Sequence, residues 1–232
     1  MGFTSKTDNC HDTATLENLT STFPVIGLIG MPNSGKTTLF NALTGSNYKT
    51  SNYPGATVEY SAGKLSQKFG FHANLLDSPG IISLNPSSPD EVITISGLFN
   101  HPKFGQPDVV IITCDTTQLS RQLFLIKQVI DAGFKTIVAL TMNDLLAKKG
   151  FEVNSVELSK ILGVDVIKIN STKYSGINDL VLRANELYKQ SLLIGEKRKV
   201  TQPETSSEEE VARLYDFTED TERKVLVPVD NK

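Results

Sequence analysis

Short runs of β-branched and other apolar residues alternate with segments of helical spacing along most of this chain. The apolar runs predict strands at Val25–Ile29, Phe71–Leu76, Asp108–Thr113, Thr136–Thr141 and Asp165–Ile169. The spacing between them predicts helices at Thr37–Thr44, Leu119–Ala132, Ser155–Leu162 and Ile177–Lys189. Alternating strands and helices favour an α/β fold with a parallel sheet covered on both faces. We therefore expect the functional loops at the carboxyl ends of these strands.

Composition divides the chain into three segments. Residues 1–22 are rich in Thr, Ser, Asn and Asp, which predicts a disordered leader. Residues 23–190 carry the alternating pattern and form the predicted domain, in which Thr57–Leu65 is expected as an antiparallel edge strand. Residues 191–232 predict a solvated linker and a short helix that begins in the acidic run Glu208–Glu210.

Charge and cysteine usage narrow the classes of partner and location. The 232 residues carry a net charge of −3, which argues against a nucleic-acid partner. Cys10 and Cys114 lie far apart, so we expect neither a disulfide framework nor a metal cluster. The scattered histidines His11, His72 and His101 are expected on the surface and predict no iron site. Without an export signal or a membrane-length apolar run, the chain is expected to be cytoplasmic.

The strongest chemical motif follows the first predicted strand. Residues 30–37 spell G-x-x-x-x-G-K-T, whose glycines let successive N–H groups face phosphate oxygens at a helix N-terminus. Lys36 is expected to reach the outer phosphates, and the hydroxyl of Thr37 to bind Mg²⁺. The predicted nucleotide contacts in this loop are Gly30, Asn33, Ser34, Gly35, Lys36, Thr37 and Thr38.

A second motif, Asp77-Ser78-Pro79-Gly80, follows the strand that ends near Leu76. Asp77 is expected to hold the water shell of Mg²⁺, and the N–H of Gly80 to meet the γ-phosphate. Thr57, between the two motifs, is predicted as a second hydroxyl ligand that orders its loop, which also includes Gly55 and Ala56. The competing interpretation of Thr57 is an ordinary strand threonine.

Base selection is predicted in the loop after the strand Thr136–Thr141. Guanine-specific enzymes carry N-K-x-D there, and the carboxylate pairs with the N1 and N2 hydrogens of guanine. Here the stretch reads Thr141-Met142-Asn143-Asp144, so the carboxylate remains while a shorter hydroxyl replaces the leading amide. Ser171-Thr172-Lys173 matches the S-A-K loop whose backbone N–H caps guanine O6. We expect guanine to be preferred, with lowered affinity.

In this order the motifs resemble those of the small GTPases, and more closely the cytosolic G domain of the bacterial ferrous iron transport protein B family. The likeness is carried by residues 30–45, 52–59, 77–84 and 114–123, and it extends from about Val25 to Lys189. The stretch Tyr53–Glu59 is the most telling, because aromatic-Pro-Gly-x-Thr-Val-Glu is unusual in other GTPases. Residues 211–217 resemble the opening of the family's helical regulatory subdomain.

The resemblance implies a Ras-like P-loop GTPase fold, with a mostly parallel six-stranded sheet, helices on both faces and a short helical C-terminal tail. It implies GTP and GDP as ligands and Mg²⁺ as cofactor. The family continues into a membrane pore, so a chain that ends at Lys232 is expected to hold the switch and a fragment of the regulator. Its expected place is the cytoplasmic face of the bacterial inner membrane, with the iron-transport pore, accessory proteins or a second copy as partners.

The resemblance also implies a mechanism. Ile81 stands where many GTPases carry a water-orienting glutamine, which an alkyl side chain cannot replace. Asn33 matches the asparagine that binds K⁺ in potassium-activated GTPases, where the cation supplies positive charge during phosphoryl transfer. A turn residue that tolerates unusual torsion is the other interpretation of Asn33. The expected catalytic residues are Asn33, Lys36 and Thr57.

Three functions fit these motifs. The leading hypothesis is a switch that binds GTP and slowly hydrolyses it in ferrous iron uptake. Thr141 and Thr172 also allow a nucleotide-sensing or partner-binding module that has lost hydrolysis. The third hypothesis is a ribosome-assembly GTPase, which would share Asn33 and the phosphate loop. This hypothesis predicts an appended basic RNA-binding domain, whereas the tail after Thr201 is acidic.

Overall fold

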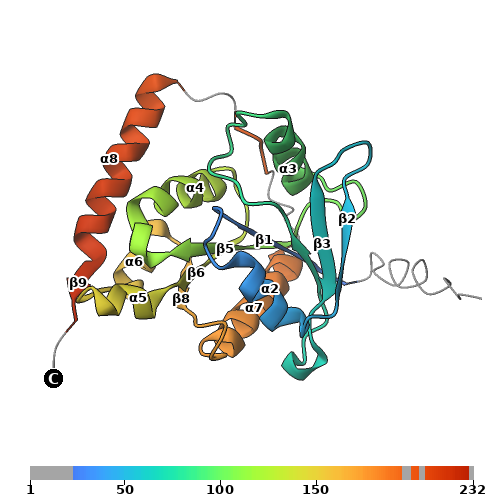
Figure 1. Cartoon of the computed structure of the whole chain (residues 1–232), viewed down its shortest axis with the longest axis horizontal. Helices are drawn as coiled ribbons and strands as arrows, with labels where there is room; N and C mark the ends of the chain where they lie inside the picture. The colour runs from blue at the N-terminus through green and yellow to red at the C-terminus, as the bar shows by residue number, and fades with distance from the viewer. Residues whose placement is uncertain (1–22, 195–199, 204–206, 230–232) are drawn as a thin grey trace, which may run out of the picture.

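The computed structural model describes residues 23–194, 200–203 and 207–229. Its centre is a seven-stranded sheet in the order β2-β3-β4-β1-β5-β6-β8 (Figure 1). The strands are β1 (Val25–Gly30), β2 (Tyr48–Asn52), β3 (Glu59–Lys64), β4 (Asn74–Asp77), β5 (Val109–Asp115), β6 (Thr136–Thr141), β7 (Phe151–Val153), β8 (Asp165–Lys168) and β9 (Leu226–Pro228). The α-helices are α2 (Lys36–Thr44), α3 (Pro89–Phe99), α4 (Leu119–Asp131), α5 (Asn143–Lys148), α6 (Ser155–Leu162), α7 (Ile177–Ile194) and α8 (Glu208–Val225). Short 3₁₀ turns lie at Gln67–Phe69 and Thr116–Gln118.

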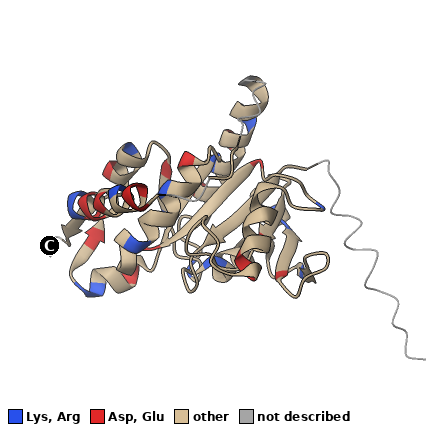
Figure 2. Cartoon of the chain, turned by 90° about the horizontal axis from the view of Figure 1, so that it is seen from above, with Lys and Arg blue, Asp and Glu red and all other residues tan. Residues whose placement is uncertain are grey.

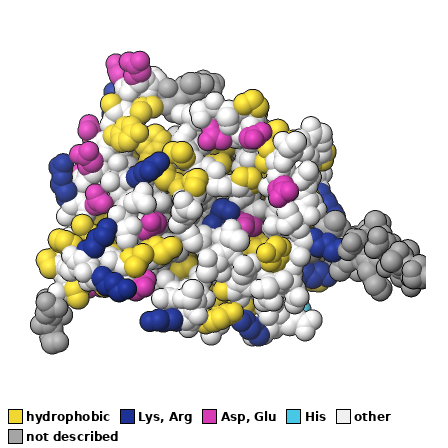
Figure 3. Space-filling model, viewed as in Figure 1, with side chains coloured by type: hydrophobic (Ala, Val, Ile, Leu, Met, Phe, Trp, Pro, Cys, Tyr) yellow, Lys and Arg dark blue, Asp and Glu magenta, His cyan; other side chains and the backbone are white. Residues whose placement is uncertain are grey.

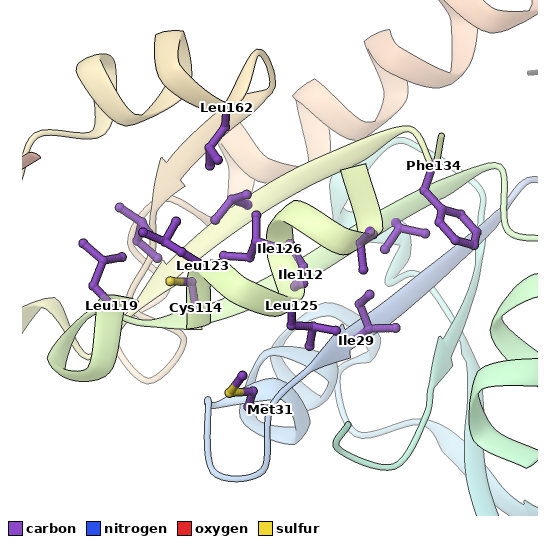
Figure 4. Close-up of a cluster of buried hydrophobic side chains, with 14 of the residues drawn as sticks. Ile29, Met31, Ile112, Cys114, Leu119, Leu123, Leu125, Ile126, Phe134 and Leu162 are labelled. Atoms are coloured by element: carbon purple, nitrogen blue, oxygen red, sulfur yellow. The ribbon is translucent and has the colours of Figure 1, made fainter. Parts of the chain in front are cut away.

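Two apolar layers cover the two faces of the sheet. Strand β5 shows why, because Val109 and Ile111 face one layer while Val110 and Ile112 face the other. Helices α2 and α7 pack on the first face, and α3, α4 and α6 pack on the second (Figure 4 shows part of the second layer). Strands buried on both faces are nearly all apolar, which is why β1, β5 and β6 were predictable from the sequence. The predicted α/β class and the mostly parallel sheet are confirmed.

The sheet has one strand more than the predicted six. The additional strand, β2, pairs antiparallel with β3 from Tyr48↔Gly63 to Asn52↔Glu59. Its residues alternate between exposed and half-buried and include no apolar run, so periodicity did not reveal it. β2 rather than β3 is therefore the edge strand, which corrects the expected place of Thr57–Leu65. Helices α3 and α5 were also not predicted; α3 begins with a Ser88 cap followed by Pro89.

Helix α8 is longer than the short helix expected, with 18 residues. The Ser207 hydroxyl accepts from the N–H of Glu210, and the Glu210 carboxylate accepts from the N–H of Ser207, so a capping box starts the helix. The helix packs on α4 and α6, with the Tyr215 and Phe124 rings 5.0 Å apart. β9 then pairs with β7. The predicted leader at 1–22 lies outside the described residues.

Charged residues of both signs lie near one another in the described part of the chain. Basic and acidic residues are interspersed along α8 (Figure 2), where Arg223 pairs with Glu219 and Lys224 with Asp220. Both signs are also mixed on the face shown in Figure 3. Within the described residues, no helix combines the length and apolar character that crossing a membrane requires.

The expectation that the histidines lie on the surface is wrong for His101. Its side chain is buried, with ring centroids 4.5 Å from Tyr60, 5.2 Å from Tyr53 and 5.1 Å from Phe104. Burial and the nearby charge of Lys103 lower the pKa of His101 to about 4, so the ring is neutral at pH 7. His72 is exposed, and His11 lies outside the described residues.

Candidate nucleotide-binding site

The phosphate loop connects β1 to α2 at the carboxyl edge of the sheet. Gly35 caps α2 with φ 84°, and Asn33 adopts φ 64°, a left-handed torsion that asparagine tolerates better than most residues. A Cβ at Gly30 would lie 2.2 Å from the Thr113 hydroxyl, so only glycine fits there. The loop therefore presents the N-terminus of α2, with its unpaired N–H groups, to an anion.

Lys36 and Asp77 meet beside this loop. The Lys36 Nζ donates to Asp77 Oδ1 at 2.5 Å, and the Thr37 hydroxyl donates to Asp77 Oδ2 at 3.3 Å. The exposed side-chain fractions of Lys36 and Asp77 are only 10% and 8%. One carboxylate therefore contacts both a predicted phosphate-binding cation and a predicted Mg²⁺ ligand. Hydroxyl and carboxylate oxygens are the hard donors that Mg²⁺ prefers, so this pair fits that ion.

The segment after Asp77 lies against the phosphate loop. The N–H of Ile81 donates to the carbonyl of Gly30 at 3.1 Å. A Cβ at Gly80 would come within 2.8 Å of the Pro32 nitrogen, so the close approach requires glycine. The Ile81 side chain is 1% exposed and belongs to the core layer shared with α4. Ile81 thus has a packing role, and its buried alkyl group is not available to a water molecule.

The loop that holds Thr57 turns back on itself between β2 and β3. Gly55 has φ 74°, and the N–H of Ala56 donates to the carbonyl of Tyr53 at 3.0 Å. Thr57 is exposed, and within the described residues its side chain forms no hydrogen bond to Thr37 or Asp77. The structure therefore brings Thr37 and Asp77 together but leaves the predicted third Mg²⁺ ligand apart from them.

The loop after β6 is tied to the phosphate loop by Thr141. Its hydroxyl contacts the carbonyls of Ser34 at 2.8 Å and Cys114 at 3.1 Å. The Thr116 hydroxyl donates to the Thr141 carbonyl at 2.9 Å. Met142, with φ 56°, then starts α5. Thr141 is therefore a buried linking residue, and not a side chain directed toward solvent.

The remaining predicted base contacts lie on neighbouring loops. Asp144 is exposed, and within the described residues its carboxylate forms no ion pair. The Asn170 carboxamide oxygen accepts from the Thr172 hydroxyl at 2.8 Å and from the Lys173 N–H at 3.0 Å, which shapes the stretch that includes Ser171. The exposed Thr38 lies one residue after Thr37 on α2.

Three further side chains of this region are not among the predicted site residues. The Thr113 hydroxyl lies 2.6 Å from the Ser34 hydroxyl, Thr116 is bonded to the loop after β6, and the Asn143 amide joins two loops. Thr113 lies near the carboxyl end of β5, Thr116 follows β5, and Asn143 follows β6. Polar residues at the carboxyl ends of predicted strands were the available signal, but their partners lie far away in the chain.

Comparisons with known proteins point to one family. A family model described as ferrous iron transport protein B matches residues 24–184. The Fe(2+) transporter FeoB of Leptospira biflexa is 37% identical over 166 residues, which cover 71% of this chain and 24% of that protein. The Fe(2+) transporter FeoB of Escherichia coli K12 is 39% identical over 166 residues, covering 69% of this chain and 21% of that protein. The chain thus spans about a quarter or less of the length of these relatives.

Solved structures give the same result. The cytosolic domain of the T. maritima FeoB iron transporter in a GDP form aligns with TM-score 0.74 and 26% identity, over 88% of this chain and 98% of that one. The G domain of the same transporter aligns with TM-score 0.63 and 36% identity, over 71% and 98%. The fold is therefore the Ras-like P-loop GTPase fold expected from the motifs.

Proposed function

This chain belongs to the ferrous iron transport protein B family, and we propose that it is a G domain that binds GTP and GDP and slowly hydrolyses GTP in ferrous iron uptake. The observation that supports this most directly is the contact of Asp77 with both Lys36 and Thr37 at the phosphate loop. One solved relative is described as being in a GDP form, which supports the same class of ligand.

The proposed roles follow from the placement of the side chains. The N–H groups at the start of α2 bind the phosphates, and Lys36 exchanges its contact with Asp77 for phosphate oxygens. Thr37 and Asp77 would hold Mg²⁺, which when bound would neutralise charge on the phosphate oxygens. Thr57 joins them when its exposed loop closes on the γ-phosphate. Asp144 selects guanine, with the 171–173 backbone on the other side of the base.

Asn33 is the proposed ligand for K⁺. Its side chain is exposed, and within the described residues no hydrogen bond to that side chain competes for the carboxamide oxygen. The left-handed torsion of Asn33 also fits the other interpretation, in which Asn33 is a turn residue. Because buried Ile81 cannot orient water, turnover should depend on a charge supplied at this position.

The second candidate is a nucleotide-sensing module without hydrolysis. It is favoured by the separation of Thr57 from Asp77 and by the alkyl side chain at Ile81. Phosphate release measured with and without K⁺ separates the two candidate functions, because only the first predicts turnover that rises with K⁺.

We also propose that the protein acts at the cytoplasmic face of the bacterial inner membrane, beside an iron-transport pore, an accessory protein or a second copy.

Calorimetric titration with a non-hydrolysable GTP analogue and Mg²⁺ tests the core of the proposal. We expect binding to the unaltered chain, loss of binding in Lys36→Ala, and unchanged binding in Lys160→Ala, whose exposed partner is Glu157. Absence of binding to the unaltered chain at millimolar ligand would contradict the proposal.

A further inference from the structure

The Asn143 side chain joins two loops that border the proposed guanine site. Its amide nitrogen donates to the Leu140 carbonyl at 2.8 Å and to the Ile169 carbonyl at 3.2 Å. We propose that Asn143 is a positioning residue for guanine, which holds the Asp144 loop at a fixed distance from the 170–173 loop. This inference rests on the proposed function of the site.

The side chains of Thr141 and Asn143 donate hydrogen bonds to different loops. The Thr141 hydroxyl carries a single proton, and its oxygen lies within hydrogen-bond distance of two acceptors, the carbonyls of Ser34 and Cys114. It has no second donor for the loop after β8. The Asn143 amide has two protons, and its contacts are the ends of β6 and β8. Thr141 thus ties the base loop to the phosphate loop, while Asn143 ties it to the loop on the other side.

The Asn143 contacts lie where the sheet ends. The β6 to β8 register extends to Leu140↔Lys168, and the N–H of Ile169 still donates to the Leu140 carbonyl at 2.9 Å. Beyond this bond, the Asn143 contact with the Ile169 carbonyl is the next hydrogen bond between the two segments among the described residues. Asp144 and Asn170 follow at once on the two sides. The amide therefore sets the spacing between the exposed Asp144 carboxylate and the backbone that Asn170 shapes.

Capping of α5 does not explain this side chain. A capping side chain accepts a hydrogen bond from an N–H group of the first turn, whereas the Asn143 amide nitrogen donates to strand-end carbonyls. The residue before the helix is Met142, which makes no side-chain cap. The contacts of Asn143 therefore serve the two loops.

The decisive measurement compares GDP with ADP, because the diphosphate is common to both and only guanine offers the Asp144 carboxylate two neighbouring N–H donors. In Asn143→Ala and in the milder Asn143→Ser, calorimetry with Mg²⁺ should show GDP affinity lowered about tenfold for Ala and ADP affinity unchanged. A matched control is Asn154→Ala, which removes the cap of α6 and should lower the melting temperature without changing the ratio of GDP to ADP affinity.

Two results would overturn the inference. They are an unchanged GDP affinity in both Asn143 variants, and an equal fall of GDP and ADP affinity, which would indicate loss of structure alone. Failure of the proposed function looks different, because the unaltered chain itself would then bind no GDP. Guanine preference in the unaltered chain, together with unaffected Asn143 variants, would reject the positioning role only.

Discussion

The ammonium of Lys36 and the carboxylate of Asp77 form a buried ion pair beside the phosphate loop, with 2.5 Å between Nζ and Oδ1. Both groups are also the ones proposed to contact the nucleotide and its metal ion. If those roles hold, phosphate oxygens would compete with Asp77 for Lys36, and Mg²⁺ would compete with Lys36 for Asp77. On the proposed function, ligand binding would be an exchange of partners at two side chains that are themselves largely buried.

Asp77→Ala should lower the free energy of unfolding by about 3 kcal/mol, because it leaves the buried charge of Lys36 without a partner. GDP should restore part of this loss by giving Lys36 a phosphate. Urea denaturation measures both effects. The control is Asp131→Ala, which breaks the exposed pair with Lys127 and should cost less than about 1 kcal/mol. Equal losses in the two variants would contradict the buried pair.

Gly97→Ala tests the packing of the Thr57 loop on α3. A Cβ at Gly97 would lie 2.5 Å from the Tyr53 ring, so the ring must move. Helix propensity alone would make alanine more stable than glycine by about 1 kcal/mol. We expect the opposite sign, a loss of about 1 to 3 kcal/mol in urea denaturation, because overpacking dominates. Ser96→Ala, at an exposed neighbouring position, should not be destabilising. A stabilised Gly97→Ala protein would show that Tyr53 is free to move.

His101 should make stability depend on pH. Its pKa is about 4 in the folded protein, below the ordinary 6.5, so folding favours the neutral ring. This contribution is fully present above pH 6.5 and is lost as the pH falls toward 4. His101→Asn does not titrate but keeps an acceptor for the N–H groups of Lys103 and Phe104. Chemical denaturation at several pH values should show a shallower pH dependence between 6.5 and 4 in the variant. Parallel curves would mean that the ring is accessible to protons when folded.

Two substitutions at Thr141 should act in opposite directions on GDP affinity. Thr141→Asn offers a longer amide with a second donor, and we expect tighter binding by about 1 kcal/mol. Thr141→Val keeps the shape but removes the hydroxyl, which leaves the Ser34 and Cys114 carbonyls without this donor and should weaken binding. Calorimetric titration of both variants provides the measurement. Unchanged affinity in Thr141→Asn would mean that the loop does not contact the base.

The sequence was most informative where the environment of an element is uniform. The strands around Ile29, Ile112 and Leu140 are buried on both faces, so their apolar runs were evident. The sequence pattern does not predict β2, because an edge strand needs no apolar side chains. It needs only a partner strand such as β3 for its backbone hydrogen bonds. His101 was misplaced for a related reason, since a lone polar residue gives no sign of the rings that enclose it.

Residue order by itself determined the phosphate loop, because the torsions at Gly35 and Asn33 and the helix that follows depend on neighbouring residues. Only the tertiary structure decided which residues from distant parts of the chain contact one another around the phosphate loop and the base loop. Thr113 meets Ser34 across 79 positions, Thr141 meets Ser34 across 107, and Asn143 reaches Ile169 across 26. These contacts depend on the spatial order of the strands in the sheet. A parallel sheet brings the carboxyl ends of strands from distant parts of the chain to one edge.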